Sequence, residues 1–210
     1  MKRKSIIAFV GTDGSGKTTV MNAVLPELEK SIGAKFIVHH LKPDLLPPLG
    51  RFRGVKHEEG YVCTNPHGSK PSGCVGSLIR LVYLTLDYIL GYWLKVCPAI
   101  RDKSCAGWVF DRYAYDMCLD PLRFRIKLPS SIIRFVLRLI PEPDLVICLG
   151  GDANKIHARK PEISIEEVVQ QIEVLKSLCK KNSRMHWVDT TVSLEETILR
   201  VKNLLKEALS

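Results

Sequence analysis

The strongest constraint on this sequence is an eight-residue stretch near its start, GTDGSGKT at positions 11–18. It follows a short apolar run at 5–10 with the length and composition of a buried strand. Every position matches G-x-x-x-x-G-K-[ST], a loop whose backbone N–H groups surround phosphate oxygens. A chance match in an ordinary glycine-rich loop is the alternative, but the flanking strand and helix argue against it. The sequence predicts a strand, a phosphate-binding loop and a helix.

This loop is expected to bind a nucleoside triphosphate. Lys17 is expected to reach the β- and γ-phosphates, and the Thr18 hydroxyl to bind Mg²⁺. The helix that follows adds its partial positive charge at its N-terminus. The residues expected to bind ATP in this segment are Gly11, Thr12, Asp13, Gly14, Ser15, Gly16, Lys17, Thr18 and Thr19.

The rest of the chain alternates between strand and helix patterns. Further strands are predicted at 35–39, 107–110, 144–149 and 185–188, and helices at 17–31 and 78–96. Ser164 and Ser193 each begin an S-x-x-E capping box that opens another helix. This alternation predicts an α/β fold with a parallel sheet covered on both faces, in which ligands bind at the carboxyl ends of the strands. We expect a single domain over 1–210, with a long Pro/Gly-rich loop at 40–76.

Composition narrows the class of protein. Of the 210 residues, 46% are hydrophobic and 25% charged, which excludes wholesale disorder. The apolar run at 78–96 is long enough to raise the question of a membrane span. Asp87 in its middle would cost about 3 kcal/mol near a bilayer centre, so we favour a buried helix of a soluble protein. Seven cysteines without a C-x-x-C pair, and no export signal, indicate reduced thiols in a cytoplasmic protein.

The net charge of +9 fits a polyanionic ligand, nucleic acid or an anionic membrane without choosing among them. Much of it lies at 123–138, which is interpreted as a solvated basic face. Nucleic acid is not the expected partner, and a peripheral membrane contact has no specific support. No histidine–cysteine cluster has zinc spacing, so no zinc site is expected.

Two further groups of residues suit phosphate chemistry. Asp111 and Arg112 follow the strand at 107–110. The carboxylate can hold Mg²⁺ and the guanidinium can bind a second phosphate, with a surface ion pair as the alternative. Arg159 and Lys160 are adjacent cations that could neutralise a transferring phosphoryl group, or could simply favour the dipole of their own helix.

With these motifs in place, the chain resembles the thymidylate kinase family of P-loop nucleotide kinases. The resemblance rests on FVGTDGSGKTT, VFDRY, PDLVICLGGDANKIHARK and HWVDTTVSLEETILRVKNLL, and covers most of the chain. It implies a three-layer α-β-α P-loop kinase fold with a five-stranded parallel sheet. It also implies ATP and Mg²⁺ as cofactors, a small-molecule phosphate acceptor and a homodimer packed through helices.

The resemblance also implies roles for individual residues. Asp13 would face a sugar hydroxyl of the acceptor, Arg112 would bind its phosphate and Asp111 would help hold the metal. Arg159 would belong to a short lid at 152–163. Because the loop carries Ser15 where some members have an arginine, the lid would supply the catalytic cation, from either Arg159 or Lys160. The expected catalytic residues are Lys17, Asp111, Arg112 and Arg159.

The acceptor half departs from the family pattern. Lys42 lies where the family has an arginine near the acceptor phosphate. The helix facing the base carries Leu84 and Tyr88 in place of the thymine-binding pair, and Asp87 beside them would suit a hydroxyl or amine group. Losing those groups should weaken the selection of thymine. The full set expected on the acceptor side is Asp13, Lys42, Leu84, Asp87, Tyr88, Arg112 and Tyr113.

Two classes of function stay open at this point. The first is a kinase that phosphorylates a nucleoside monophosphate, with dTMP as the default acceptor and a sugar, sugar phosphate or nucleoside as the alternative. The second is a nucleotide-dependent binding or regulatory protein with little transfer activity. Asp111, Arg112 and Arg159 favour the enzyme, because a binding switch has less need of acceptor-side cations.

Overall fold

The computed structural model describes residues 5–47, 73–102 and 104–209, and its centre is one parallel sheet of five strands. The strand order is β2-β3-β1-β4-β5, so the strand before the phosphate-binding loop lies in the middle. This confirms the predicted α/β architecture. The strands are β1 Ser5–Gly11, β2 Lys35–His40, β3 Cys105–Asp111, β4 Leu145–Gly150 and β5 Met185–Asp189.

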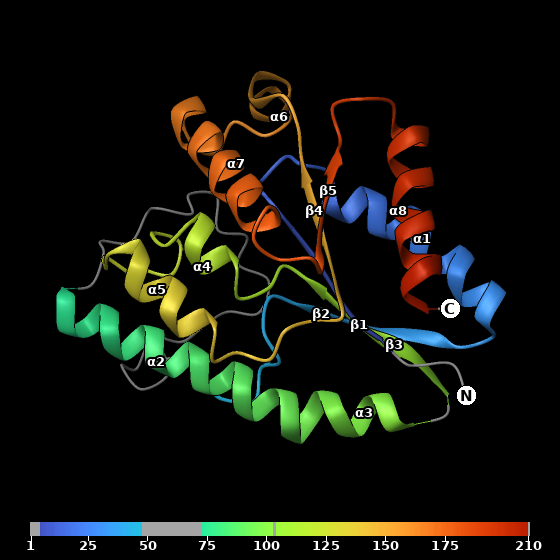
Figure 1. Ribbon diagram of the computed structural model, residues 1–210, viewed down its shortest axis with the longest axis horizontal. Coiled ribbons are helices and arrows are strands. Elements are labelled where there is room, and N and C mark those ends of the chain that lie inside the picture. The colour runs from blue at the N-terminus through green and yellow to red at the C-terminus, as the bar shows by residue number, and fades with distance from the viewer. Residues whose placement is uncertain (1–4, 48–72, 103, 210) are drawn as a thin grey trace.

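Helices cover both faces of the sheet (Figure 1). On one face lie α1 Lys17–Ile32 and α8 Leu194–Leu209, which pack against each other. The other helical segments are α2 Cys74–Gly91, the π-helical η2 Tyr92–Val96, α3 Cys97–Arg101, α4 Asp116–Leu119, α5 Ser130–Leu137, α6 Ala153–Arg159 and α7 Ile165–Cys179. Of these, α2, α4, α5 and α7 contribute to the core on the opposite face.

Strand β1 shows why the sheet is buried on both sides. Ile7 and Phe9 point into the core shared with α1 and α8, whereas Ile6, Ala8 and Val10 point into the core on the other face. All seven residues of β1 are buried. Because successive side chains alternate between faces, an uninterrupted apolar run is what a doubly covered central strand requires.

The helix that begins after Ser164 has the predicted capping box. The Ser164 hydroxyl accepts a hydrogen bond from Glu167 N at 3.3 Å, and the Glu167 carboxylate accepts one from Ser164 N at 3.0 Å. Ser193 likewise accepts a hydrogen bond from Glu196 N at 3.1 Å at the start of α8. These caps satisfy N–H groups that a helix N-terminus otherwise leaves unpaired.

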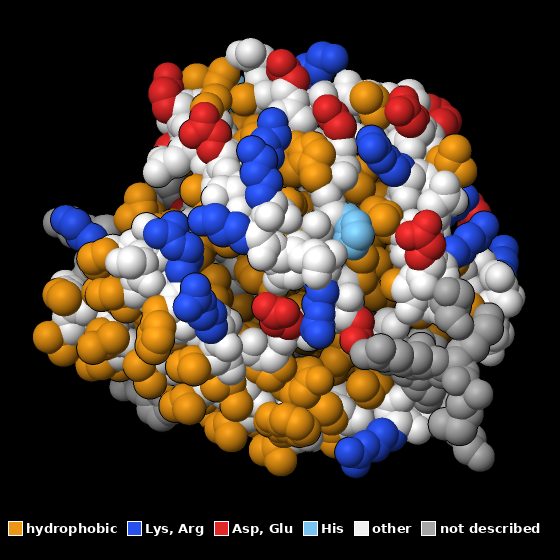
Figure 2. Space-filling view, in the orientation of Figure 1, with side chains coloured by type: hydrophobic (Ala, Val, Ile, Leu, Met, Phe, Trp, Pro, Cys, Tyr) orange, Lys and Arg blue, Asp and Glu red, His pale blue; other side chains and the backbone are white. Residues whose placement is uncertain are grey.

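The apolar segment at 78–96 is helical as predicted, but it is buried on one face only. Its inner face contributes Leu81, Tyr88 and Val96 to the core. The outer face is a stripe of exposed apolar side chains, which form much of the lower surface in Figure 2. We call it the α2 stripe; it comprises Val75, Leu78, Ile79, Val82, Leu86, Leu90, Trp93 and Leu94. By length and composition alone, Cys74–Arg101 could cross a membrane, and a third of its most apolar window is buried in the protein.

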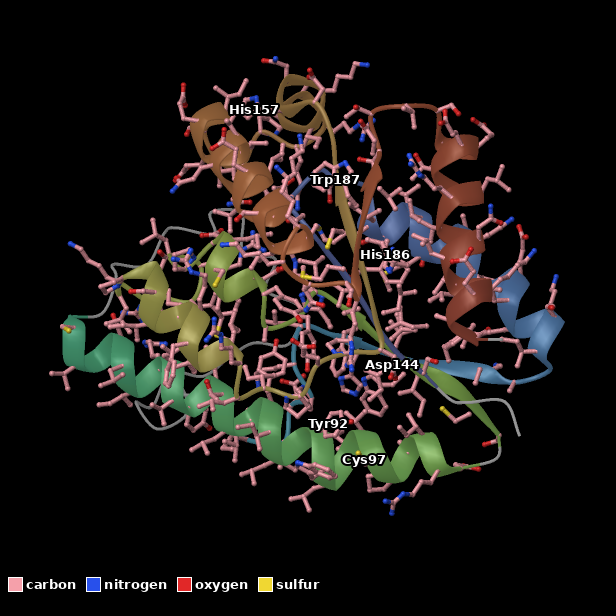
Figure 3. All side chains as sticks on the ribbon, in the orientation of Figure 1. Tyr92, Cys97, Asp144, His157, His186 and Trp187 are labelled. Atoms are coloured by element: carbon pink, nitrogen blue, oxygen red, sulfur yellow. The ribbon has the colours of Figure 1, made fainter. Side chains whose placement is uncertain are left out.

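The ends of β4 and β5 are closely packed. Trp187 of β5, labelled in Figure 3, lies against Gly150 at the end of β4. A Cβ at position 150 would come within 2.3 Å of the Trp187 ring, so a larger residue does not fit there. The ammonium of Lys176 on α7 lies 5.1 Å from the ring centroid of Trp187. This packing fixes the point at which the chain leaves the sheet toward α6.

The predicted loop at 40–76 is described only at its two ends. Residues 41–47 follow β2, and α2 begins at Cys74, inside the predicted loop. Residues 48–72 lie outside the described part of the chain.

Candidate functional site

The phosphate-binding loop curls between β1 and α1 at the carboxyl edge of the sheet. Gly14 and Gly16 have φ values of 79° and 80°, a left-handed conformation that glycine adopts without strain. A Cβ on Gly14 would lie 2.6 Å from the Ile156 carbonyl oxygen and 3.2 Å from the Lys160 Cβ. The loop and the end of α6 are therefore in close contact. Figure 3 labels His157 on this helix.

Lys17 lies at the centre of the loop. Its Nζ donates hydrogen bonds to the carbonyl oxygens of Gly11 at 2.9 Å and Thr12 at 2.7 Å, and lies 3.3 Å from the Ser15 hydroxyl. Burial and the neighbouring charge of Arg112 lower the pKa of Lys17 to about 7, although nearby carboxylates oppose this. An anion bound in the loop would supply the counter-charge that the buried ammonium needs.

A cleft of about 290 Å³ opens beside this loop. It brings together four segments that are far apart in the sequence: the loop, the end of β2, the end of β3 and the end of α6. Its lining residues are Asp13, Gly14, Gly16, Lys17, Thr18, Thr19, His40, Asp111, Arg112 and Lys160. We call it the phosphate cleft. Several expected site residues therefore lie in one cleft.

Two oxygen ligands in the phosphate cleft suit Mg²⁺. Asp111 Oδ2 lies 3.4 Å from His40 Nδ1, while its Oδ1 is buried and has no hydrogen-bond partner in the protein. Burial opposes ionisation of Asp111, but His40 and Lys17 outweigh it and lower its pKa. Thr18 exposes its side chain to the same cleft. The described residues hold no cluster of three acidic, histidine or cysteine ligands, and Mg²⁺ in phosphate sites commonly takes one or two protein ligands with phosphate and water.

A second cleft of about 240 Å³ adjoins the first through Gly16 and Thr19. We call it the base cleft, because its apolar walls and its position beside the loop suit the flat ring of a nucleotide. Its other lining residues are Val20, Arg159, Thr190, Val192, Leu194 and Thr197. The sequence analysis did not propose the lining residues that follow β5, from Thr190 to Thr197, as site residues. No sequence motif in this turn indicates contact with a ligand.

The two lid cations lie in different clefts. Arg159 donates a hydrogen bond to the Thr190 carbonyl oxygen at 2.9 Å and lines the base cleft. Lys160 lines the phosphate cleft and pairs with Glu162 at 3.1 Å. The Lys160 side chain is about half exposed. Of the two, Lys160 is the one placed beside Asp13 and Arg112.

Arg112 occupies a conformation that few non-glycine residues adopt, with φ 76°. Its backbone N–H donates to the Phe9 carbonyl oxygen at 2.8 Å, which ties it to β1. Its guanidinium pairs with Asp13 on the loop and with Asp116 at 2.7 Å. Burial opposes the charge of Arg112, but the carboxylates outweigh it and raise the pKa further above its usual range.

Asp13 also pairs with Arg123, which sequence reasoning had placed in a solvated basic face. That interpretation is wrong for this residue, because its side chain is only 24% exposed and reaches the phosphate-binding loop. Burial raises the pKa of Asp13, but Arg112, Arg123 and Lys17 outweigh it and lower the pKa to about 2. No local motif marks Arg123; its role depends on how the chain turns after α4.

The other expected acceptor-side residues direct their polar atoms into the protein. Asp87 is fully buried and accepts hydrogen bonds from Lys42 Nζ at 2.5 Å, Leu45 N at 2.8 Å and Leu46 N at 2.7 Å. Lys42 also pairs with Asp44 at 2.8 Å. These bonds fix the chain that leaves β2.

The aromatic candidates are buried as well. Tyr88 donates to the Leu41 carbonyl oxygen at 2.7 Å, and Tyr113 donates to the carbonyl oxygen of Pro141. Both rings belong to the core, against which Leu84 packs. The structure thus groups Asp13, Arg112 and Lys17 around one cleft and gives Tyr88 and Tyr113 internal hydrogen bonds.

Comparison with solved structures places this architecture among the P-loop folds of thymidylate kinases. The crystal structure of thymidylate kinase from Ehrlichia chaffeensis aligns with a TM-score of 0.60 at 16% identity, over 96% of this chain and 98% of its own. Thymidylate kinase from Candida albicans aligns with a TM-score of 0.62 at 18% identity, over 99% and 93%. No family model and no curated protein sequence matches the chain. The thymidylate kinase fold is therefore present along nearly the whole chain.

The pKa of Lys17 leads to a testable prediction. At pH 8 a lysine with a pKa of about 7 is mostly neutral, and a bound triphosphate favours its charged form. Binding of Mg·ATP should therefore take up to about one proton at pH 8 and much less at pH 6. Isothermal titration calorimetry in buffers of different ionisation enthalpy measures this uptake. Lys17→Met is the control and should lose it; equal uptake in both proteins would contradict the prediction.

The network around Asp87 leads to a second prediction. Asp87→Asn places an amide donor among three donors, so the free energy of unfolding should fall by about 2–3 kcal/mol in urea denaturation. Asp44→Asn is the matched control, because Asp44 pairs with the same Lys42 but is 56% exposed; its cost should stay below about 1 kcal/mol. If Asp87→Asn kept full stability and only acceptor use were impaired, Asp87 would instead contact the acceptor.

Proposed function

We propose that this protein is a Mg·ATP-dependent phosphotransferase, a kinase acting on a small-molecule acceptor. The observation that carries the proposal is the phosphate cleft, which is lined by Lys17 and Thr18 of the loop together with Asp111 and Arg112. A site that only bound ATP would need Lys17 and Thr18 but would have no need of the Arg112 guanidinium. Because the cleft also holds an acceptor-side guanidinium, a phosphoryl group can lie between donor and acceptor groups.

On the donor side, the loop N–H groups and Lys17 bind the triphosphate, and the base lies in the base cleft beside Arg159. Thr18 and Asp111 would hold Mg²⁺, which would neutralise part of the phosphate charge when bound. Lys160, rather than Arg159, is then the lid cation closest to the transferring group. These residues position the phosphates and stabilise charge, which accounts for most of the catalysis in phosphoryl transfer.

The default acceptor is a nucleoside monophosphate, with dTMP as the first to test. Both aligned structures are of thymidylate kinases, and the one from Candida albicans is described as having broad substrate specificity. In this chain Asp87 and Tyr88 have internal partners, so we assign them to the walls of the acceptor site and not to base recognition. A cytoplasmic location, where ATP is abundant, suits this activity.

An acceptor screen tests the proposal. Purified protein with Mg·ATP is offered dTMP, dUMP, UMP, CMP, free nucleosides, sugars and sugar phosphates, and product masses are read out. We expect at least one acceptor to gain a phosphoryl group. Lys17→Ala should lose the activity by about a thousandfold or more while staying folded, because it removes charge stabilisation at the transferring group. ATP binding without transfer to any acceptor would favour a binding or regulatory protein instead.

We also propose that the protein forms a homodimer through the α2 stripe. Apolar side chains recur along one side of the helix, and Val75, Trp93 and Leu94 are each more than 60% exposed. A surface of this kind is typical of an interface. Light scattering should give twice the 23.7 kDa of one chain.

Ile79→Glu in the α2 stripe should yield the monomer, because a buried carboxylate without a partner disfavours association. Leu199→Glu, an exposed leucine on α8, is the matched control and should leave the dimer intact. A wild-type monomer that sediments with lipid vesicles would mean that the α2 stripe contacts a membrane.

A further inference from the structure

Another cavity, of about 510 Å³, lies beside the amino ends of β4 and β5. It is enclosed by α5, the end of α7 and the chain that enters β4, and we call it the α5–α7 cavity. It shares no lining residue with the phosphate cleft or the base cleft, which lie at the carboxyl ends of the strands. Its lining residues are Tyr115, Ser131, Arg134, Phe135, Leu137, Arg138, Glu142, Leu178, Lys181, Asn182 and Met185.

Three cations from two segments line the α5–α7 cavity. Arg134 lies on α5, Arg138 directly after it, and Lys181 just after α7. All three are exposed, and none of their side chains makes an ion pair or hydrogen bond with another residue in the described part of the chain. Lys and Arg side chains surround apolar ones over α5 and the end of α7 in Figure 2. These cations are therefore available to a ligand.

Glu142 is the one acidic residue in this lining, and it has partners of its own. Its Oε1 accepts a hydrogen bond from Asn182 Nδ2 at 3.3 Å, and its Oε2 lies 3.9 Å from Arg184 Nη1. Three cations and one carboxylate give the lining side chains a net charge of +2. The cavity therefore favours an anion of about two charges.

The remaining wall is apolar apart from one phenol. Phe135, Leu137, Leu178 and Met185 supply the apolar surface, and Phe135 is 64% exposed. The Tyr115 side chain is only 8% exposed, yet its hydroxyl makes no hydrogen bond with another described residue. Burial and the Glu142 carboxylate raise the pKa of Tyr115, so its hydroxyl stays a neutral donor. A nearly buried donor without a protein partner suits a polar ligand group.

We propose that the α5–α7 cavity binds a soluble phosphomonoester with an aromatic or aliphatic body, whose phosphate lies among Arg134, Arg138 and Lys181. This site is separate from the proposed kinase site. A phosphate dianion matches the net charge of the lining, and its oxygens can accept hydrogen bonds from two forked guanidiniums. The body of the ligand would pack on Phe135 and Leu178.

Two properties of the cavity favour this class of ligand over a membrane lipid. Its volume lies within the range of about 300–1,000 Å³ typical of small-molecule sites, which combine apolar walls with a few polar groups. The phosphodiester of most membrane lipids carries only one negative charge, so it matches three unpaired cations less well than a phosphomonoester does.

Calorimetric titration with naphthyl phosphate tests the proposal. The protein is first saturated with Mg·ADP, so that the donor clefts are occupied. Naphthyl phosphate should bind about tenfold or more tightly than naphthol, which lacks the phosphate, and than inorganic phosphate, which lacks the ring. Phe135→Ala should weaken the binding of naphthyl phosphate and leave that of inorganic phosphate within about twofold.

Neighbouring lysines provide a matched pair of variants. Lys181→Gln should weaken the binding of naphthyl phosphate by about tenfold, as should Arg138→Gln, because each removes a charged hydrogen-bond donor. Lys180→Gln removes the same charge from the adjacent exposed residue, which does not line the cavity, and should stay within about twofold of wild type. All three side chains are exposed, so these variants should fold as the wild type does.

Three results would overturn the proposal. The first is a wild type that does not bind naphthyl phosphate. The second is binding that is equal in wild type, Lys181→Gln and Arg138→Gln, because the ester would then lie elsewhere. The third is sedimentation with phosphatidylglycerol vesicles that depends on Lys181 while naphthyl phosphate does not bind, because the cations would then contact a lipid surface. None of these results depends on whether the acceptor screen detects kinase activity.

Discussion

The pairing of β1 with β3 and β4 determines the position of the residues that line the phosphate cleft. β1 is hydrogen-bonded to β3 on one side and β4 on the other, with Phe9 opposite Asp111 and Gly11 opposite Leu149. This register brings the end of β3 beside the start of the phosphate-binding loop. The hydrogen bond from Arg112 N to the Phe9 carbonyl oxygen extends the pairing of β1 and β3 by one residue. Shifting β1 by one residue would move the side chains packed in each core into the core on the other face of the sheet, so packing on both faces also fixes the site.

The parts of the fold that depend on local patterns were predictable from the sequence. The strands were predicted within one or two residues, because buried strands read as short apolar runs. The loop was predicted because glycine, lysine and hydroxyl residues must stand at fixed positions in it. The capping box at Ser164 was predictable because both of its partners lie within four residues.

What the sequence could not supply were contacts between distant segments. Arg123 meets a residue more than a hundred positions earlier in the chain, and the turn that directs it depends on burial of Ile126. Lys42 and Asp87 are each charged and were natural candidates for binding an acceptor. Only the folded chain shows that they bind each other and that the backbone after β2 occupies the remaining carboxylate oxygen. The exposure of the α2 stripe was likewise hidden, since an apolar pattern shows which residues avoid water and not what covers them.

The backbone of Arg112 has a consequence for how this protein can change. A left-handed conformation costs a residue with a Cβ roughly 1–2 kcal/mol, and glycine would remove that strain. Glycine would also leave the buried carboxylates of Asp13 and Asp116 without the Arg112 guanidinium, and removing one partner of a buried ion pair costs about 3–5 kcal/mol. The ion pairs of Arg112 therefore outweigh its backbone strain, and one side chain both stabilises the fold and places a positive charge at the cleft.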